Sequence, residues 1–334
     1  MSDKHYSFLK QIYQSKEIDN VLKNKDAIPV GARTYFRSKY NTYKFLKNIG
    51  VKTPKLYAHY SPLKDHLELD SGFYFCKPEF GWGSKGIFNL EVKNNKYYID
   101  NYTFPTIKEV FQNKEITHPY IIEERAFNLG DDNRDKGITD IKFYCFQNNT
   151  APLCLVVNRT KKLLFWLNEK AEIVHAGIPS KVSGKYLENQ LHISLAKYSK
   201  KAFNLLRLLN LEKRRVDFFK LCYNQKRAKR LKEKIFHDME ELSDEMFFEI
   251  QNKALSIMQK IPLSFCRIDF FNSTDGILVN ELTPIPGDTK LFYPEYDYLL
   301  GKQLHESKII FKNKFYNGYF NEQMSVLGHD IVYE

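Results

Sequence analysis

The chain has 334 residues, of which 43% are hydrophobic and 15% aromatic, so it is globular and long enough for two or three packed lobes. Its formal net charge of +11 predicts an anionic partner. The five cysteines are scattered without a CxxC pair, which excludes a disulfide framework or a zinc cluster. No signal peptide and no run of ~20 apolar residues is visible, so we expect a cytoplasmic protein without membrane insertion.

The N-terminal third begins with helices and continues with strands. Apolar residues at helical spacing predict helices over 1–30 and 38–49, with Ser38 as the N-cap and Gly50 as the stop of the second. A period of two then predicts extended segments. These segments are LYAHY, HLELD, GFYFCKP, GIFNLEV, KYYID and, after a short helix at 106–112, PYIIEE.

The rest of the chain follows the same mixed pattern. A polar loop at 129–137 precedes a hairpin formed by TDIKFYCF and PLCLVVNRT. Helices are predicted at 190–209 and 213–260, the second carrying the basic run KRAKRLKEK. The strands CRIDFF and ILVNELTP close the pattern. This order indicates α+β lobes, and neither a dinucleotide fingerprint nor a P-loop is present.

A lysine and a glycine-rich loop form the first candidate site. Lys77 lies near the end of a strand, and the loop after it contains Gly81, Gly83, Ser84 and Gly86. Glycines let backbone N–H groups approach an anion, and the lysine adds a point charge to the same phosphates. The alternative is an ordinary hairpin turn beside a solvated lysine.

A pair of carboxylates in a hairpin forms the second candidate site. Strands that meet around residues 272–276 place Asp269 opposite Val279 and put Glu281 at the diagonal position on the same face. Two acids in an apolar hairpin suit a hard cation, Mg²⁺ or Mn²⁺. The alternative is that Arg267, opposite Glu281 in this register, neutralises the acids as a salt bridge.

Several segments, in their order along the chain, resemble the ATP-grasp superfamily, in particular the branch of teichuronopeptide-biosynthesis (TupA-like) proteins. The resemblance covers roughly residues 36–300 and implies an ATP-grasp fold, in which two α+β subdomains grip ATP. The segments are SKYNTYKFLKNIGVKTPKLY, FYFCKPEFGWGSKG, PYIIEERAF, TDIKFYCF, KIPLSFCRIDFF and ILVNELTPIPGD.

The resemblance also implies a division of the chain and roles for single residues. The implied parts are a helical region (1–60), a subdomain with phosphate loop and adenine hinge (61–130), a subdomain with the metal hairpin and a charged helical elaboration at about 213–245 (131–300), and a tail (301–334). The implied roles are ATP phosphate binding by Lys77 and Lys39, adenine binding by the backbone of Glu123, Glu124 and Arg125, a γ-phosphate contact by Lys142 beside Asp140, and Mg²⁺ binding by Asp269 and Glu281. Thr283 replaces an asparagine that is frequent two residues after the metal-binding glutamate, which leaves the second metal position open.

The function implied by the resemblance is an ATP-dependent carboxylate–amine ligase that works through an acyl-phosphate. Arg267 would stabilise the transferred phosphoryl group. The partners would be ATP, an anionic carboxylated acceptor and an amine, in cell-surface polysaccharide synthesis. A kinase for a sugar or other small acceptor is the alternative. A nucleic-acid-binding protein, suggested by the charge and KRAKRLKEK, lacks any accompanying motif, so no nucleic acid is expected.

Overall fold

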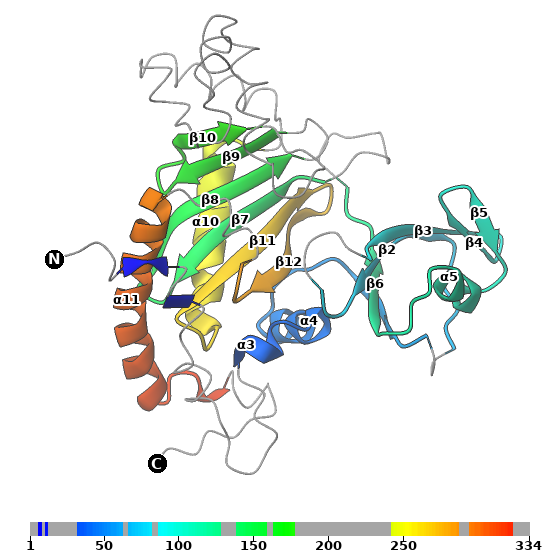
Figure 1. Ribbon diagram of the computed structural model, residues 1–334, viewed down its shortest axis with the longest axis horizontal. Helices are drawn as coiled ribbons and strands as arrows, with labels where there is room; N and C mark the ends of the chain where they lie inside the picture. The colour runs from blue at the N-terminus through cyan, green and yellow to red at the C-terminus, as the bar shows by residue number, and fades with distance from the viewer. Residues whose placement is uncertain are drawn as a thin grey trace, which may run out of the picture.

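Two antiparallel sheets make up most of the structure (Figure 1). The computed structural model describes residues 6–8, 11–12, 32–62, 66–81, 86–127, 138–158, 163–177, 242–286 and 294–322. All strand pairs in these stretches are antiparallel. The fold class is therefore α+β, as the order of predicted elements indicates.

The first sheet has the strand order β1-β6-β2-β3-β4-β5. Helix α5 (Ile107–Asn113) packs on one of its faces. Tyr74 and Cys76 of β2 enter the core beneath α5, so Phe75 and Lys77 lie on the opposite face. The strands are β1 (Leu56–Tyr60), β2 (Gly72–Pro78), β3 (Phe88–Lys93), β4 (Lys96–Ile99), β5 (Tyr102–Phe104) and β6 (Tyr120–Glu124).

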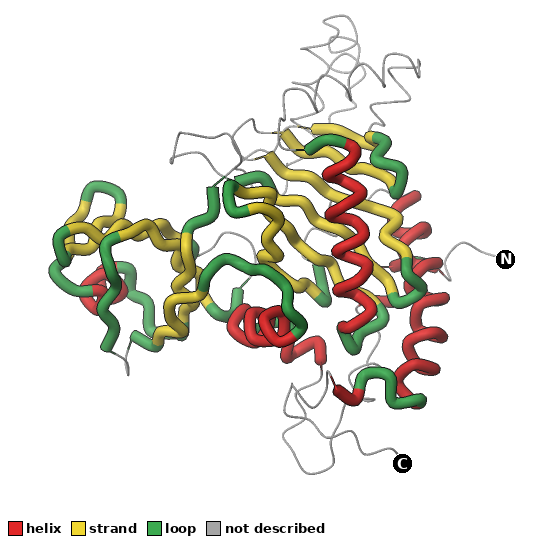
Figure 2. The backbone as a smooth tube through the Cα atoms, turned by 180° about the vertical axis from the view of Figure 1, so that it is seen from behind, coloured by secondary structure: helices red, strands yellow, loops and turns green. Residues whose placement is uncertain are grey.

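The second sheet has the strand order β10-β9-β8-β7-β11-β12. Helices α10 (Asp244–Lys260) and α11 (Pro294–Tyr316) lie on opposite faces of it, as the front and back views show (Figures 1 and 2). The strands are β7 (Asp140–Phe146), β8 (Thr150–Asn158), β9 (Leu163–Asn168), β10 (Ile173–Gly177), β11 (Phe265–Ser273) and β12 (Gly276–Thr283).

The α11 face of the second sheet changes from apolar to charged along its strands. Tyr144 and Phe265 belong to the core beneath α11. Further along the same strands, and on the same face because side chains alternate, come Lys142, Arg267 and Asp269. Apolar packing therefore holds one end of the strands in place, while the other end presents charged groups.

A short helical segment connects the two sheets. Helix α4 (Lys39–Asn48) begins at Ser38, whose side chain accepts the N–H of Asn41, and ends before Gly50, which has φ of 74°. Its buried face joins the core of the second sheet. The residues that follow form backbone hydrogen bonds with both sheets: the carbonyl of Lys52 accepts from Val279, and the carbonyl of Lys55 accepts from Glu124.

Most of the expected elements that lie in the described residues are present, and some differ. HLELD is not a strand, because Leu67 and Leu69 pack against the first core without joining a ladder. Strands β5, β9 and β10 were not predicted. Most of 1–30, and the predicted helical residues 190–209 and 213–241, lie outside the described residues. Within the described residues, no helix has the length and apolar character that crossing a membrane requires.

Candidate functional site

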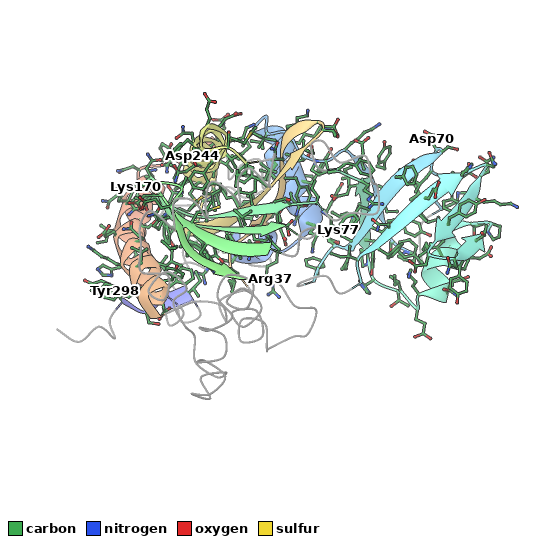
Figure 3. The ribbon with its side chains drawn as sticks, turned by 90° about the horizontal axis from the view of Figure 1, so that it is seen from above. Arg37, Asp70, Lys77, Lys170, Asp244 and Tyr298 are labelled. Atoms are coloured by element: carbon green, nitrogen blue, oxygen red, sulfur yellow. The ribbon has the colours of Figure 1, made fainter. Side chains whose placement is uncertain are left out.

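Lys77 is a buried cation on the face of the first sheet that lies opposite α5. Its side chain is 5% exposed and forms an ion pair with Glu123 on the neighbouring strand β6. Its ammonium also lies 5.3 Å from the centre of the Phe75 ring. A buried ammonium needs an anionic partner, and Glu123 is that partner here. Figure 3 shows Lys77 in the region between the two sheets.

Lys39 reaches the same region from the first turn of α4. Its ammonium donates to the carbonyl of Gly81 at 3.4 Å. Burial lowers the pKa of Lys39, while the carboxylates of Glu281 and Glu123 act in the opposite direction. Lys39 is therefore within electrostatic reach of both sheets, because Glu123 lies in the first and Glu281 in the second.

Glu79 fixes the base of the glycine-rich loop, and the sequence analysis did not single it out. Its carboxylate accepts from the hydroxyl of Ser38 at 2.5 Å and lies 2.8 Å from Nε2 of His59. Its backbone carbonyl accepts the N–H of Lys39 at 3.1 Å. The loop, the start of α4 and strand β1 are thereby joined at one buried carboxylate. In the sequence, the signal that could have identified Glu79 is an acidic residue two positions after Lys77.

The glycine-rich loop ends at Gly86, a position that requires glycine. Gly86 has φ of 76°, and a Cβ there would lie 2.7 Å from the hydroxyl oxygen of Tyr120. That hydroxyl donates to the carbonyl of Gly86 at 2.8 Å. Only glycine fits this position without displacing its neighbour. Gly83 and Ser84, also predicted to bind phosphate, lie outside the described residues.

The segment predicted as the adenine hinge lies at the end of β6. The backbone N–H of Glu124 donates to the carbonyl of Lys55, and the N–H of Arg125 donates to the carbonyl of Phe73. Both N–H groups are thus used within the protein, and the segment is fixed between β1 and β2. The adenine-binding role of Glu123, Glu124 and Arg125 stays a prediction.

The register of the carboxylate hairpin differs from the predicted one. Asp269 lies directly opposite Glu281, not opposite Val279, and Arg267 lies opposite Thr283, not opposite Glu281. The difference arises because the turn is tighter than assumed and because Asn280 is an extra residue in β12. Asp269 and Glu281 still share one face and are closer than the diagonal placement implied.

Asp269 is the centre of a charged cluster on the second sheet and is fully buried. Arg267 donates to both of its carboxylate oxygens at 2.7 Å, and Lys142 donates to Oδ2 at 2.6 Å. Burial alone would raise the pKa of Asp269, but these two cations outweigh it and hold that pKa below its usual range. The predicted alternative of an Arg267 salt bridge is therefore present, and its carboxylate is that of Asp269.

Lys142 connects this cluster to Asp140. Its ammonium lies 3.7 Å from the Asp140 carboxylate, on the same face of β7. Burial alone would lower the pKa of Lys142, but Asp140 and Asp269 outweigh it and the pKa is raised. The predicted neighbourhood of Lys142 and Asp140 is confirmed, and Asp269 is a further partner.

The oxygen donors at the hairpin suit a hard divalent cation. Asp269 and Glu281 are paired across the hairpin, and Thr283, whose hydroxyl accepts from Arg267 at 3.2 Å, lies two pairs further along on the same face. Among the residues that the structure describes, no group of three or more His, Cys, Asp or Glu side chains could hold a metal ion. The donor set fits a metal ion that completes its coordination with water or with phosphate oxygens.

Asn280 joins the two groups of residues. It belongs to β12, directly before Glu281, and its Oδ1 accepts from the ammonium of Lys77 at 2.7 Å. Lys77 of the first sheet therefore contacts the second sheet directly beside Glu281. The sequence analysis did not identify Asn280.

Comparison of the sequence with protein-family models and with curated proteins finds no match. The structure aligns with D-alanine–D-alanine ligase from Bacillus anthracis, at 11% identity and a TM-score of 0.46, over 85% of this chain and 71% of that chain. It aligns with an L-amino acid ligase from Bacillus licheniformis at 13% identity and a TM-score of 0.35, over 79% and 44%. It also aligns with the ATP-grasp ligase PsnB, in complex with a phosphomimetic variant of its minimal precursor, Mg and ADP. The identity is 11% and the TM-score 0.37, over 84% of this chain and 59% of that chain.

The chain thus spans less than two thirds of the second and third of these proteins. All three TM-scores lie below 0.5.

Proposed function

We propose that the chain is an ATP-grasp enzyme, an ATP-dependent carboxylate–amine ligase of the TupA-like kind. One observation carries the proposal: the buried Lys77 of the first sheet donates to Asn280 of the second, next to the cross-strand pair of Asp269 and Glu281. Cations for phosphates and oxygen donors for a metal ion are thereby brought to one place, as Mg²⁺–nucleotide binding requires.

The first sheet and the start of helix α4 supply the phosphate-binding half of the proposed site. Lys77 and Lys39 would hold the phosphates as point charges, and the glycine-rich loop between Gly81 and Gly86 would add backbone N–H groups. Glu79 has no direct part in phosphate binding, because its carboxylate is held by Ser38 and His59. It fixes the loop against α4, so that the lysines and the loop keep their relative positions.

The second sheet supplies the half that holds the metal ion and the transferred group. Asp269, Glu281 and Thr283 would hold Mg²⁺, which neutralises phosphate charge when bound. Arg267 and Lys142 would stabilise the transferred phosphoryl group, and they keep the Asp269 carboxylate oriented through three hydrogen bonds.

The proposed reaction needs no protein nucleophile. An oxygen of the acceptor carboxylate attacks the γ-phosphorus, the bond to the bridging oxygen of ADP breaks, and an acyl-phosphate forms. An amine then attacks the acyl carbon, phosphate leaves and the nitrogen loses a proton, which gives an amide. The protein contributes positioning and charge.

The acceptor follows from the resemblance of the sequence to the TupA-like branch. We propose a carboxylated sugar or peptide of cell-surface polysaccharide synthesis, and an amino acid or amine as the second substrate. The net charge of +11 suits an anionic acceptor. Asp288 and Lys290, which the sequence suggests as acceptor contacts, lie outside the described residues.

The test is an assay of ADP and phosphate release over a panel of uronic acids and amino acids. We expect phosphate release that needs both a carboxylate and an amine, and its loss in Lys77→Ala and Glu281→Gln. A stable phosphorylated product would instead identify a kinase. Full ATP turnover in both variants would show that the site is misassigned.

A further inference from the structure

Strand β12 contains a β-bulge at Asn280. From the turn outward, Ser273 pairs with Gly276 and Phe270 pairs with Val279, in one continuous register. The next pair is Asp269 with Glu281, so Asn280 has no partner of its own on β11. A bulge of this kind adds one residue to one strand, leaves that residue unpaired in the ladder and bends the strand.

The bulge decides which face Glu281 occupies. In a continuous register Asp269 would pair with Asn280, and Glu281 would pair with Ile268. Ile268 is fully buried in the core beneath α10, so Glu281 would then enter that apolar core. The extra residue moves Glu281 to the opposite face, beside Asp269.

Asn280, the bulged residue itself, contacts the first sheet. Its Oδ1 accepts from the ammonium of Lys77 at 2.7 Å, between residues 203 positions apart in the sequence. Lys77 also pairs with Glu123, and its ammonium lies over the ring of Phe75. The flexible side chain of Lys77 is therefore held by contacts from both sheets.

We propose that Asn280 is a positioning residue for Lys77, and that the bulge couples the placement of this lysine to the pairing of Asp269 with Glu281. The proposal rests on the proposed function, because the phosphates of a nucleotide are the expected ligand of Lys77. One inserted residue would thus set both the phosphate-binding cation and the metal-binding carboxylates.

The chemistry of an amide suits this role. An asparagine oxygen accepts a hydrogen bond and orients the ammonium without adding a negative charge. Glu123 already balances the buried charge of Lys77. A second carboxylate at position 280 would compete with phosphate for the ammonium and repel the ligand. A shorter side chain at position 280 would remove this hydrogen bond, and the ammonium of Lys77 could then move away from the position that binds phosphate.

The test is a double-mutant cycle with Asn280→Ala and Lys77→Met, measured as binding of a non-hydrolysable ATP analogue with Mg²⁺ by calorimetry. We expect Asn280→Ala to weaken binding about tenfold, which is typical for a hydrogen bond to a charged group. In the Lys77→Met background the same change should have no further effect, because the residue that it positions is absent. Asn280→Asp should weaken binding further than Asn280→Ala.

An equal loss of affinity in both backgrounds would overturn the proposal, since Asn280 would then act independently of Lys77. If Asn280→Ala does not fold, Asn280→Ser replaces it, because a serine keeps the bulge polar but is too short to reach Lys77. Absence of nucleotide binding by the unmodified chain would instead reject the proposed function. In that case the cycle is measured by urea denaturation, and additive effects on unfolding would show that the Lys77–Asn280 contact carries no coupling.

Discussion

Arg267 and Asp269 are neighbours on one face of β11, and Arg267 holds both carboxylate oxygens of Asp269 at 2.7 Å. Asp269 is fully buried, and Lys142 is a second cationic partner of it. A carboxylate in such a place is stable only while its cations remain, because an unpaired buried charge is costly. This relationship makes the charged end of the second sheet sensitive to single substitutions.

Replacement of Arg267 by alanine is expected to destabilise the fold. The change leaves Asp269 buried with one cation fewer, and removal of one partner from a buried ion pair costs about 3–5 kcal/mol. The measurement is the free energy of unfolding from urea denaturation. Lys302→Ala, at an exposed position of α11, is the matched control and should change stability by less than about 0.5 kcal/mol. A loss for Arg267→Ala as small as that of the control would contradict the role of the pair.

Stability should depend on pH through Glu123. Burial raises the pKa of the Glu123 carboxyl, against the opposing effect of Lys77 and Lys39, so the folded chain keeps this proton to higher pH than the unfolded chain. Stability therefore falls as the pH rises from the unfolded pKa of about 4.3 through the raised folded pKa.

The measurement compares the wild-type chain with Glu123→Gln, which does not titrate at this position. The unfolding free energy of the wild-type chain, relative to that of the variant, should decrease as the pH rises above the unfolded pKa, by about 1.4 kcal/mol for each unit of pKa shift. A difference that stays constant or grows in favour of the wild-type chain over this range would be evidence against a raised pKa.

Ser38→Ala should cost more stability than a comparable change at another helix start. Ser38 caps α4 and donates to the buried carboxylate of Glu79, so its removal loses a cap worth about 1 kcal/mol and leaves a buried acceptor without that donor. Thr106 also caps a helix, α5, and donates to the carboxylate of Glu109, but at an exposed site, so it is the control. We expect about 2 kcal/mol or more for Ser38→Ala and about 1 kcal/mol for Thr106→Ala in urea denaturation. Equal losses would show that the buried contact with Glu79 contributes no more than an exposed one.

Gly86→Ala should displace the described end of the glycine-rich loop. The left-handed backbone at Gly86 costs a non-glycine residue about 1–2 kcal/mol, and the new Cβ would meet the hydroxyl of Tyr120 at 2.7 Å. Gly50→Ala is the control, since Gly50 has a similar φ of 74° with nothing within 4 Å of the new Cβ. Thermal denaturation should show a larger loss for Gly86→Ala, and Tyr120→Phe in the same chain should recover part of it. If Tyr120→Phe recovers no stability, backbone strain alone would explain the loss in Gly86→Ala.

The local elements near the site were predictable from sequence because their signals are local. A capping serine, apolar residues at helical spacing and a terminal glycine define α4, and alternating side chains define β2 and the hairpin of β11 and β12. The alternation that also predicted a strand at HLELD was misleading, since Leu67 and Leu69 are partly buried without strand pairing. The alternation of apolar and polar residues indicates which side chains are buried. Whether the segment pairs as a strand depends on a partner strand that is distant in sequence.

The sequence by itself determined which residue types are present at the site: Lys77 before a glycine-rich loop, and Asp269 and Glu281 in one hairpin. Only the tertiary structure decided their partners. The bulge at Asn280, the pairing of Asp269 with Glu281 and the contact between Asn280 and Lys77 depend on how two sheets meet, which no local period records. A buried charge needs a partner, and tertiary packing between segments that are far apart in sequence determines which residue that partner is.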